Sequence, residues 1–223
     1  MAKNFTDVRT SVNLLWMAAQ TEAAAPRSDP AEAEITRTFM SSRQQATVQS
    51  LLDAAEEVLR RNGYDEMTLR LVATEAGVTH TTAYTYFSSK AHLVAEVFWR
   101  RLRRIPHPKH TSDASLTERV DAALRGPGLA LSDEPELAQG ALAALLTGDP
   151  DAQRVRDRVG GDLAERIATA LGDEVDPTVS EALLLAFSGA MLQAGMGYFE
   201  FDGVVSRVTA AAALMEDTHP TIG

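Results

Sequence analysis

The segment of residues 69–93 constrains the fold of this chain more than any other stretch. Its apolar residues recur at helical spacing before Gly77 and again after Thr79, which predicts two short helices. Gly77 tolerates the left-handed backbone that ends a helix, and the hydroxyl of Thr79 can cap the helix that follows. Ser89 can cap a further helix that begins at Lys90. Two short helices joined by a glycine turn predict a helix-turn-helix.

The remainder of the chain also repeats its apolar residues at helical spacing and has no convincing strand alternation. Glycine and proline clusters punctuate this pattern. Outside the helix-turn-helix we expect helices at about residues 46–62, 90–104, 115–126, 135–147, 150–171, 177–199 and 204–217. The sequence therefore predicts an all-α protein of about nine helices. We expect a helix-turn-helix domain with a connecting helix over residues 41–104 and a helical body over residues 105–223.

Residues 1–40 are expected to form an N-terminal extension. A helical stripe predicts one amphipathic helix, formed by Phe5, Val8, Val12 and Leu15. A linker rich in alanine and proline follows it. Two interpretations stay open, because the extension can be an inactive tail or a helix that docks on the body or on a partner. Met40 is also a possible alternative start.

Charge is distributed unevenly along the chain, whose formal net charge is −10. Residues 37–104 carry a net charge of +3, whereas residues 105–223 carry −11. A basic module on an acidic body is typical of nucleic-acid binding.

Composition excludes several classes of protein. The chain has no cysteine, so it has neither a disulfide framework nor a cysteine–zinc site. Its apolar runs are too short to span a bilayer, and its N-terminus is a poor signal peptide, so a cytoplasmic protein is expected. No nucleophile–base pair, metal-ligand spacing or phosphate loop appears, so we expect neither an enzyme nor a cofactor or metal site.

An ordered set of residues between positions 51 and 98 resembles a known family. The set comprises Asn62-Gly63-Tyr64, Thr68, Ala76-Gly77-Val78, the Tyr-x-Tyr-Phe segment of residues 84–87, and Ser89-Lys90. In this order and spacing, these features resemble the N-terminal DNA-binding domain of TetR-type transcriptional repressors. Ala83 stands where that family commonly has a larger aliphatic residue, and His80 where a longer polar side chain is frequent. Because of these differences, we expect the base preference of this chain to differ from that of other family members.

The resemblance implies a sequence-specific DNA-binding transcriptional regulator. It implies a homodimer, formed through helices at about residues 177–217, that binds double-stranded DNA at a palindromic operator. It also implies a repressor that is released by a small apolar or amphipathic ligand, bound by the helical body. An alternative stays open, in which no small molecule acts and a protein partner controls the regulator through the N-terminal extension.

The resemblance places the second helix of the motif in the major groove. Candidates for contacts to base edges are Arg70, His80, Thr81 and Thr85. Candidates for phosphate contacts are Thr68, Thr79, Thr82, Tyr84 and Lys90. Thr79 can equally be a simple helix cap.

An apolar pocket in the helical body is the expected ligand site. Its candidate lining residues are Phe98, Trp99, Phe187, Met191, Met196 and Tyr198. Methionine and aromatic residues at helical spacing also suit an ordinary core, so both interpretations stay open.

Overall fold

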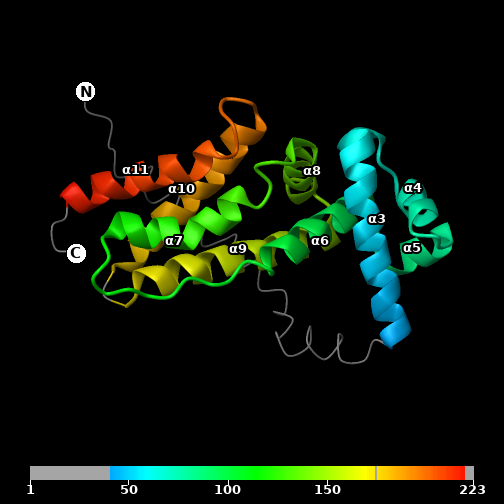
Figure 1. Ribbon diagram of the computed structural model, residues 1–223, viewed down its shortest axis with the longest axis horizontal. Helices are drawn as coiled ribbons and strands as arrows, with labels where there is room; N and C mark the ends of the chain where they lie inside the picture. Colours follow the sequence, from blue (N-terminus) through cyan, green and yellow to red (C-terminus); the bar gives the residue numbers. More distant parts are fainter. Residues whose placement is uncertain (1–40, 174, 219–223) are drawn as a thin grey trace, which may run out of the picture. The chain divides into compact units, whose positions relative to one another are not determined.

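The computed structural model describes residues 41–173 and 175–218. Within these residues the protein is all-helical, with nine helices and no strand, which confirms the predicted fold class (Figure 1). The chain divides into two compact units, Met1–Ala46 and Thr47–Gly223. Of the first unit, only residues 41–46 are described, where the side chain of Ser41 accepts a hydrogen bond from the backbone of Gln44. The helix and linker predicted for residues 1–40 lie outside the described residues.

Four helices form the N-terminal part of the second unit. They are α3 (Ser42–Glu66), α4 (Leu69–Glu75), α5 (His80–Tyr86) and α6 (Lys90–Leu102). Gly63 interrupts α3 with a φ of 71°, and Gly77 forms the turn between α4 and α5 with a φ of 67°. Both values lie in the left-handed region that favours glycine. The predicted glycine turn of the helix-turn-helix is therefore confirmed.

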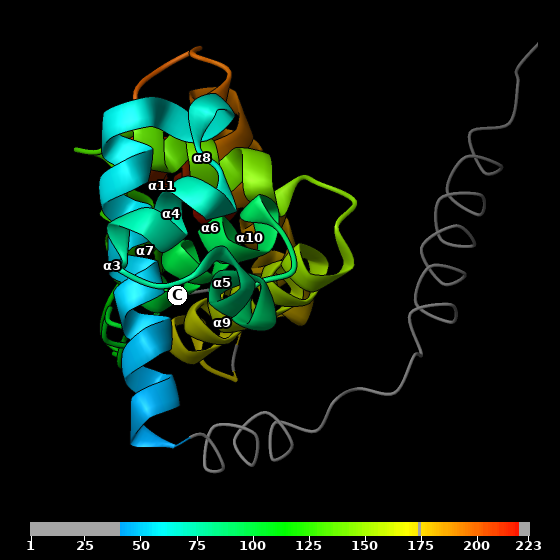
Figure 2. The same cartoon turned by 90° about the vertical axis from the view of Figure 1, so that its right-hand side faces the viewer.

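Each of the next three helices begins at a hydroxyl cap. The side chain of Thr68 accepts a hydrogen bond from the backbone of Leu71, that of Thr79 from Thr82, and that of Ser89 from His92. These caps satisfy backbone N–H groups that have no partner inside the helix. Buried side chains then hold the helices together, among them Leu51, Val72, Ala83, Phe87 and Leu93. Figure 2 looks onto this end of the unit, with α4 and α5 in front of α6.

Five helices form the body: α7 (Leu116–Leu129), α8 (Pro135–Leu145), α9 (Pro150–Leu171), α10 (Pro177–Gly195) and α11 (Gly203–Thr218). The bounds of α9 agree with the prediction. Helix α7 continues past the expected break and contains Pro127, which is buried within its last turn. Helix α10 ends before the predicted residue 199, because Gly197 has a φ of 80° and turns the chain.

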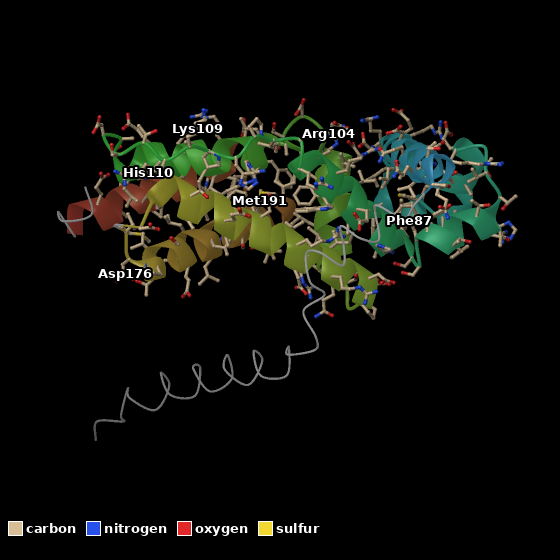
Figure 3. All side chains as sticks on the ribbon, turned by 90° about the horizontal axis from the view of Figure 1, so that it is seen from below. Phe87, Arg104, Lys109, His110, Asp176 and Met191 are labelled. Carbon is tan, nitrogen blue, oxygen red and sulfur yellow. The ribbon has the colours of Figure 1, made fainter. Side chains whose placement is uncertain are left out.

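The packing of α6 joins the helix-turn-helix to the body. Helix α6 packs against both α8 and α9, while α11 packs against α7 and α10. Figure 3 shows Phe87 near one end of the unit and His110 and Asp176 near the other, with Met191 between them.

A buried arginine on α9 forms hydrogen bonds with the end of α6. The side chain of Arg166 on α9 is 1% exposed. It donates hydrogen bonds to the backbone oxygens of Leu102, Ile105 and Pro106, at 3.3, 2.8 and 2.8 Å, and pairs with Asp162 at 2.6 Å. The contacts to Ile105 and Pro106 supply a donor to carbonyl groups just beyond the end of the helix.

In the described part of the chain, none of the helices is long and apolar enough to cross a membrane. Its His, Asp and Glu side chains form no group of three that could hold a metal ion.

Candidate functional site

The residues predicted to contact DNA lie on α4, on α5 and at the helix caps beside them. Most are exposed, including Arg70, His80, Thr81 and Thr85, and Tyr84 is 56% exposed. Thr82 and Lys90 are half-buried. The fold therefore brings the predicted residues into one short helix pair and the start of α6 (Figure 2).

Arg70 and His80 differ from the other basic side chains of this region. Within the described residues, neither side chain has a hydrogen bond or an ion pair. Nearby Arg61 is instead paired with Glu75 at 2.7 Å. Exposed donors without an internal partner can form hydrogen bonds with base edges or phosphates.

The threonine hydroxyls have local partners. The Oγ1 atom of Thr79 accepts from the backbone of Thr82 at 3.1 Å and lies 2.9 Å from the Thr82 hydroxyl. The hydroxyl of Thr85 donates to the backbone oxygen of Thr81 at 3.0 Å. Thr79 is therefore a helix cap, the alternative that the sequence left open. A phosphate contact from Thr79 would use a hydroxyl that already orders the start of α5.

Lys90 is held at the end of α3. Its Nζ atom donates to the backbone oxygens of Tyr64 and Asp65, at 2.8 and 3.4 Å, and lies 4.2 Å from the centre of the Tyr64 ring. Cations are stabilised at the negative end of a helix and over an aromatic face. Lys90 therefore joins α6 to α3, and its predicted phosphate contact would have to be made from this position.

An ion-pair network neutralises part of the predicted basic region. Glu56 on α3 accepts from Arg100 and Arg101 on α6 at 2.6 and 3.1 Å, and Glu134 accepts from Arg101 and Arg60 at 2.6 and 2.5 Å. Burial raises the pKa of Glu56, but the hydrogen bonds from Arg101 and Arg100 outweigh it and lower that pKa below its usual value. These arginines therefore stabilise the junction of α3, α6 and the start of α8.

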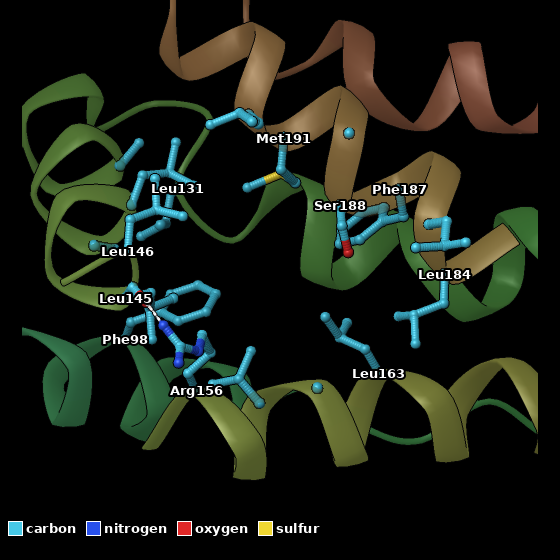
Figure 4. A pocket seen from close by; sticks show the side chains of 18 residues that line it. Phe98, Leu131, Leu145, Leu146, Arg156, Leu163, Leu184, Phe187, Ser188 and Met191 are labelled. Atoms are coloured by element: carbon cyan, nitrogen blue, oxygen red, sulfur yellow. Dashed lines mark hydrogen bonds between the residues drawn. The ribbon is translucent and has the colours of Figure 1, made fainter. Parts of the chain in front are cut away.

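A cavity of about 520 Å³ lies in the body, lined by residues of α8, α9 and α10 together with Phe98 of α6 (Figure 4). Of the predicted lining residues, Phe98, Phe187 and Met191 do line it. A cavity of this size is in the range of small-molecule sites.

The other three predicted lining residues lie elsewhere. Met196 and Tyr198 follow the end of α10 and are 61% and 76% exposed. The ring of Trp99 lies 5.4 Å from the guanidinium of Arg158, outside the cavity. Helix α10 ends before Met196 and Tyr198, so these side chains lie away from the space between α8, α9 and α10. The orientation of α6 turns the ring of Trp99 away from the same space.

Sequence reasoning missed Arg156, which lies on the wall of this cavity. Its Nη1 atom donates to the backbone oxygen of Leu145 at 2.9 Å (Figure 4). Arg156 and Gly160 recur at helical spacing with the buried Leu163 on α9, and all three residues line the cavity. This helical spacing is the sequence signal from which these lining residues could have been predicted.

The first turn of α9 contacts the segment that follows α5. The hydroxyl of Ser88 donates to Asp151, the second residue of α9. The backbone N–H of Ala152 lowers the pKa of Asp149, the residue that caps α9, and a hydrogen bond from the Ser89 side chain lowers it further. Ser88, which lies between α5 and α6, is therefore bonded to the first turn of α9.

A second contact lies about two turns further along α9. Arg158 pairs with Glu96 on α6, and Glu96 is also 3.9 Å from the Nε2 atom of His92. Burial raises the pKa of Glu96, but the interaction with His92 and the charge of Arg158 lower that pKa to a greater extent. Glu96 is therefore held ionised between the two helices. The helix that carries Arg156 on the cavity wall thus also holds the end of the helix-turn-helix.

Comparisons with known sequences cover both parts of the chain. Residues 51–97 match the family described as bacterial regulatory proteins, tetR family. The chain is 40% identical over 197 residues to an uncharacterized HTH-type transcriptional regulator of Mycobacterium tuberculosis, with 87% of this chain and 91% of that relative covered. It is 30% identical over 139 residues to the HTH-type transcriptional repressor KstR of Rhodococcus jostii, with 62% of this chain and 65% of that repressor covered.

A solved structure has the same fold. The crystal structure of a TetR transcriptional regulator from Rhodococcus sp. RHA1 matches with a TM-score of 0.63 and 23% identity. The match covers 78% of this chain and 97% of that one, so the likeness includes the helical body as well as the helix-turn-helix.

Proposed function

The chain belongs to the TetR family of bacterial regulatory proteins and is a DNA-binding transcriptional regulator, and from this premise we propose how it binds and leaves its operator. It binds a palindromic site as a homodimer, and a small apolar or amphipathic ligand in the cavity between α8, α9 and α10 releases it. It has no catalytic activity. One observation carries the release step: α9 lines the cavity and also bonds to the segment between α5 and α6.

Base-edge contact is assigned to α5 and to the start of α4. The major groove admits an α-helix and presents a distinct donor and acceptor pattern for each base pair. Arg70 has a guanidinium without an ion pair among the described residues, and such a group can bind guanine bidentately. His80 opens α5, next to Thr81, where a recognition helix commonly contacts bases.

Replacing Arg70 or His80 with alanine is expected to alter sequence preference. Each variant should lose about 10- to 100-fold in affinity for the preferred site, the loss expected from one good base contact. The measurement is fluorescence anisotropy on the parent's preferred fragment, selected from the source genome, and on versions with single base changes. Arg103→Ala, which removes an exposed charge at the end of α6, is the matched control. Equal losses on every sequence would contradict base reading by these residues.

Dimerisation is assigned to α10 and α11. Regulators of this family bind DNA and act as dimers. Leu185 and Leu192 of α10 lie two helical turns apart and are exposed, and Leu214 of α11 is exposed as well. Joining these two helices to the same pair in a second copy would bury the three leucines in a four-helix bundle.

Release requires that the ligand bind the DNA-free arrangement more tightly than the DNA-bound one. An allosteric coupling of about 1–3 kcal/mol would change DNA affinity by about 5- to 150-fold. Displacing the first turns of α9 by filling the cavity would disturb the bonds from Asp151 to Ser88 and from Arg158 to Glu96. Those bonds order the segment directly after α5.

Filling the cavity from Gly160 is expected to abolish ligand binding. A Cβ atom at Gly160 has no neighbour within 4 Å, and the residue lines the cavity, so Gly160→Trp places an indole in that space. We expect Nile red, a neutral apolar dye, to bind this variant at least about tenfold more weakly than the parent, because the space it occupies is taken.

The matched control is Gly161→Trp, at the next residue of α9, which is exposed and does not line the cavity. It should bind the dye as the parent does. Dye fluorescence and DNA affinity are measured on all three proteins. Unchanged binding to the Gly160 variant would contradict the assignment of this cavity. Dye binding that leaves the parent's DNA affinity unchanged would contradict release.

A further inference from the structure

We propose that the ligand of this cavity is an amphipathic anion whose acidic head group binds Arg156. The inference rests on the ligand role proposed above for the cavity and assigns its chemical class. The body of the molecule is apolar, with roughly 12–16 carbons, because a volume of about 520 Å³ holds roughly 17 groups of the size of a water molecule.

Arg156 is the one charged residue on the cavity wall, among the described residues that line it. Among residues 41–173 and 175–218, its guanidinium has one hydrogen bond, from Nη1 to the backbone oxygen of Leu145. No carboxylate of the described residues lies within ion-pair distance of it. Its remaining N–H groups are therefore available to a molecule in the cavity.

The other arginines of α9 show that this lack of a counterion is specific to Arg156. Arg154 is paired with Asp151, Arg158 with Glu96, and Arg166 with Asp162. Each arginine of α9 that does not face the cavity thus has a carboxylate partner, on α9 itself or on α6. The arginine that faces the cavity has none among the described residues, so a ligand anion can take that place.

The guanidinium suits a carboxylate head group. Its planar fork presents parallel N–H donors that match the two oxygens of a carboxylate, and such charge-assisted bonds strengthen in apolar surroundings. The neighbours of Arg156 on the cavity wall are apolar, with Phe98 and Leu145 beside it (Figure 4). A cation would be repelled at this position, and a neutral apolar group would leave the donors unmatched.

The rest of the cavity suits an apolar chain. Leu163 and Leu184 lie at the side of the cavity away from Arg156, and Phe187 lines the cavity from α10 (Figure 4). Within the described part of the chain, Ser188 is the only other lining residue with a polar side chain, and its hydroxyl points into the cavity from α10. The wall therefore has one charged end and one apolar end, as a molecule with a single acidic head requires.

The position of Arg156 on α9 also gives the head group an effect on DNA binding. Arg156 lies between Asp151, which accepts from Ser88, and Arg158, which pairs with Glu96. A head group bound to Arg156 therefore acts on the stretch of α9 that holds the end of the helix-turn-helix. We expect an acid to lower DNA affinity more than an alcohol of the same chain length at equal occupancy.

The test compares three probes that differ only in their head group: dodecanoate, dodecan-1-ol and dodecylamine. Their affinities for the full chain are measured by displacement of Nile red at pH 7.5. The parent is expected to bind dodecanoate about 10- to 100-fold more tightly than dodecan-1-ol, the range of a hydrogen bond to a charged group, and dodecylamine most weakly.

Arg156→Gln should bring the ratio between dodecanoate and dodecan-1-ol to within about threefold, while Arg156→Lys keeps part of it, because it retains the charge and loses the fork. Arg125→Gln, on the exposed surface of α7, should leave the ratio unchanged. The readout is a ratio within one protein, so a loss of stability in the Arg156 variants affects both probes alike.

The outcomes separate this inference from the proposal on which it rests. If all three probes bind the parent equally, or if dodecylamine binds best, the anionic class is wrong while the cavity remains a ligand site. If the Arg156→Gln variant still prefers dodecanoate, the head group binds at another residue, and the proposed role of Arg156 is wrong. If no probe displaces the dye, and the dye binds the Gly160→Trp variant as it binds the parent, both proposals fail.

Discussion

Replacing Arg166 with methionine is expected to lower the free energy of unfolding by about 3–5 kcal/mol, the largest stability effect we predict for a single side chain. Arg166 is among the largest fully buried side chains of the described residues. Its removal leaves Asp162, whose side chain is only 10% exposed, without its arginine partner. It also leaves the backbone oxygens of Ile105 and Pro106 without their shared donor at the end of α6.

The measurement is urea denaturation followed by circular dichroism at 222 nm. Arg125→Met on α7 is the control, since its side chain is 64% exposed and pairs only with Asp121 in the same helix, so a change within about 0.5 kcal/mol is expected. Adding Asp162→Asn to the Arg166 variant should recover part of the loss, because it removes the buried charge that has lost its arginine partner. A decrease in the free energy of unfolding below about 1 kcal/mol would show that the buried arginine contributes little to the packing of α6 against α9.

Placing charge on the proposed dimer surface is expected to reduce operator affinity by about 10²- to 10⁴-fold. Leu185 on α10 is 73% exposed, and Leu192 lies two turns away on the same helix. Glutamates at both positions would bring like charges together across a twofold axis in an apolar interface. A monomer then binds DNA through one helix-turn-helix, and the second half-site no longer contributes through a raised effective concentration.

Sedimentation velocity gives the oligomeric state of this double variant, and anisotropy with the full palindrome gives its affinity. Its affinity for a single half-site should equal that of the parent, because α4 and α5 are unchanged. Leu146→Glu, an exposed leucine at the end of α8, is the control and should remain a dimer. A double variant that stays dimeric, or a monomer that binds the palindrome as the parent does, would contradict the assignment of this surface.

Local interactions explain why so much of the helix-turn-helix was predictable. Gly77 forms its turn through its own backbone conformation, and Thr68, Thr79 and Ser89 each cap a helix through a backbone N–H three residues away. Such interactions depend on neighbouring residues alone, so they are visible in the sequence as spacing. The all-α fold class follows from the same 3.6-residue periodicity, and both were confirmed.

The charge pattern is different, because net charge says nothing about partners. Arg100 and Arg101 contribute to the basic character of residues 37–104, but both are bound to Glu56 of α3, more than forty positions away in the chain. Lys90 is bound to the backbone at Tyr64. Neither pairing repeats with a helical period, so the sequence predicted a basic module but not which cations remain exposed on α4 and α5.

The cavity was decided only by the tertiary structure. Phe187 and Met191 were predicted to line it because they belong to an apolar stripe, but Met196 lies beyond the point where α10 ends. Arg156 reaches the cavity because α9 crosses the end of α8, where the oxygen of Leu145 accepts its hydrogen bond. The sequence by itself determined which helices form and where most of them begin, since those depend on residues within a few positions. Which side chains share a cavity depends on how helices pack across long separations in the chain, and packing leaves no period in the sequence.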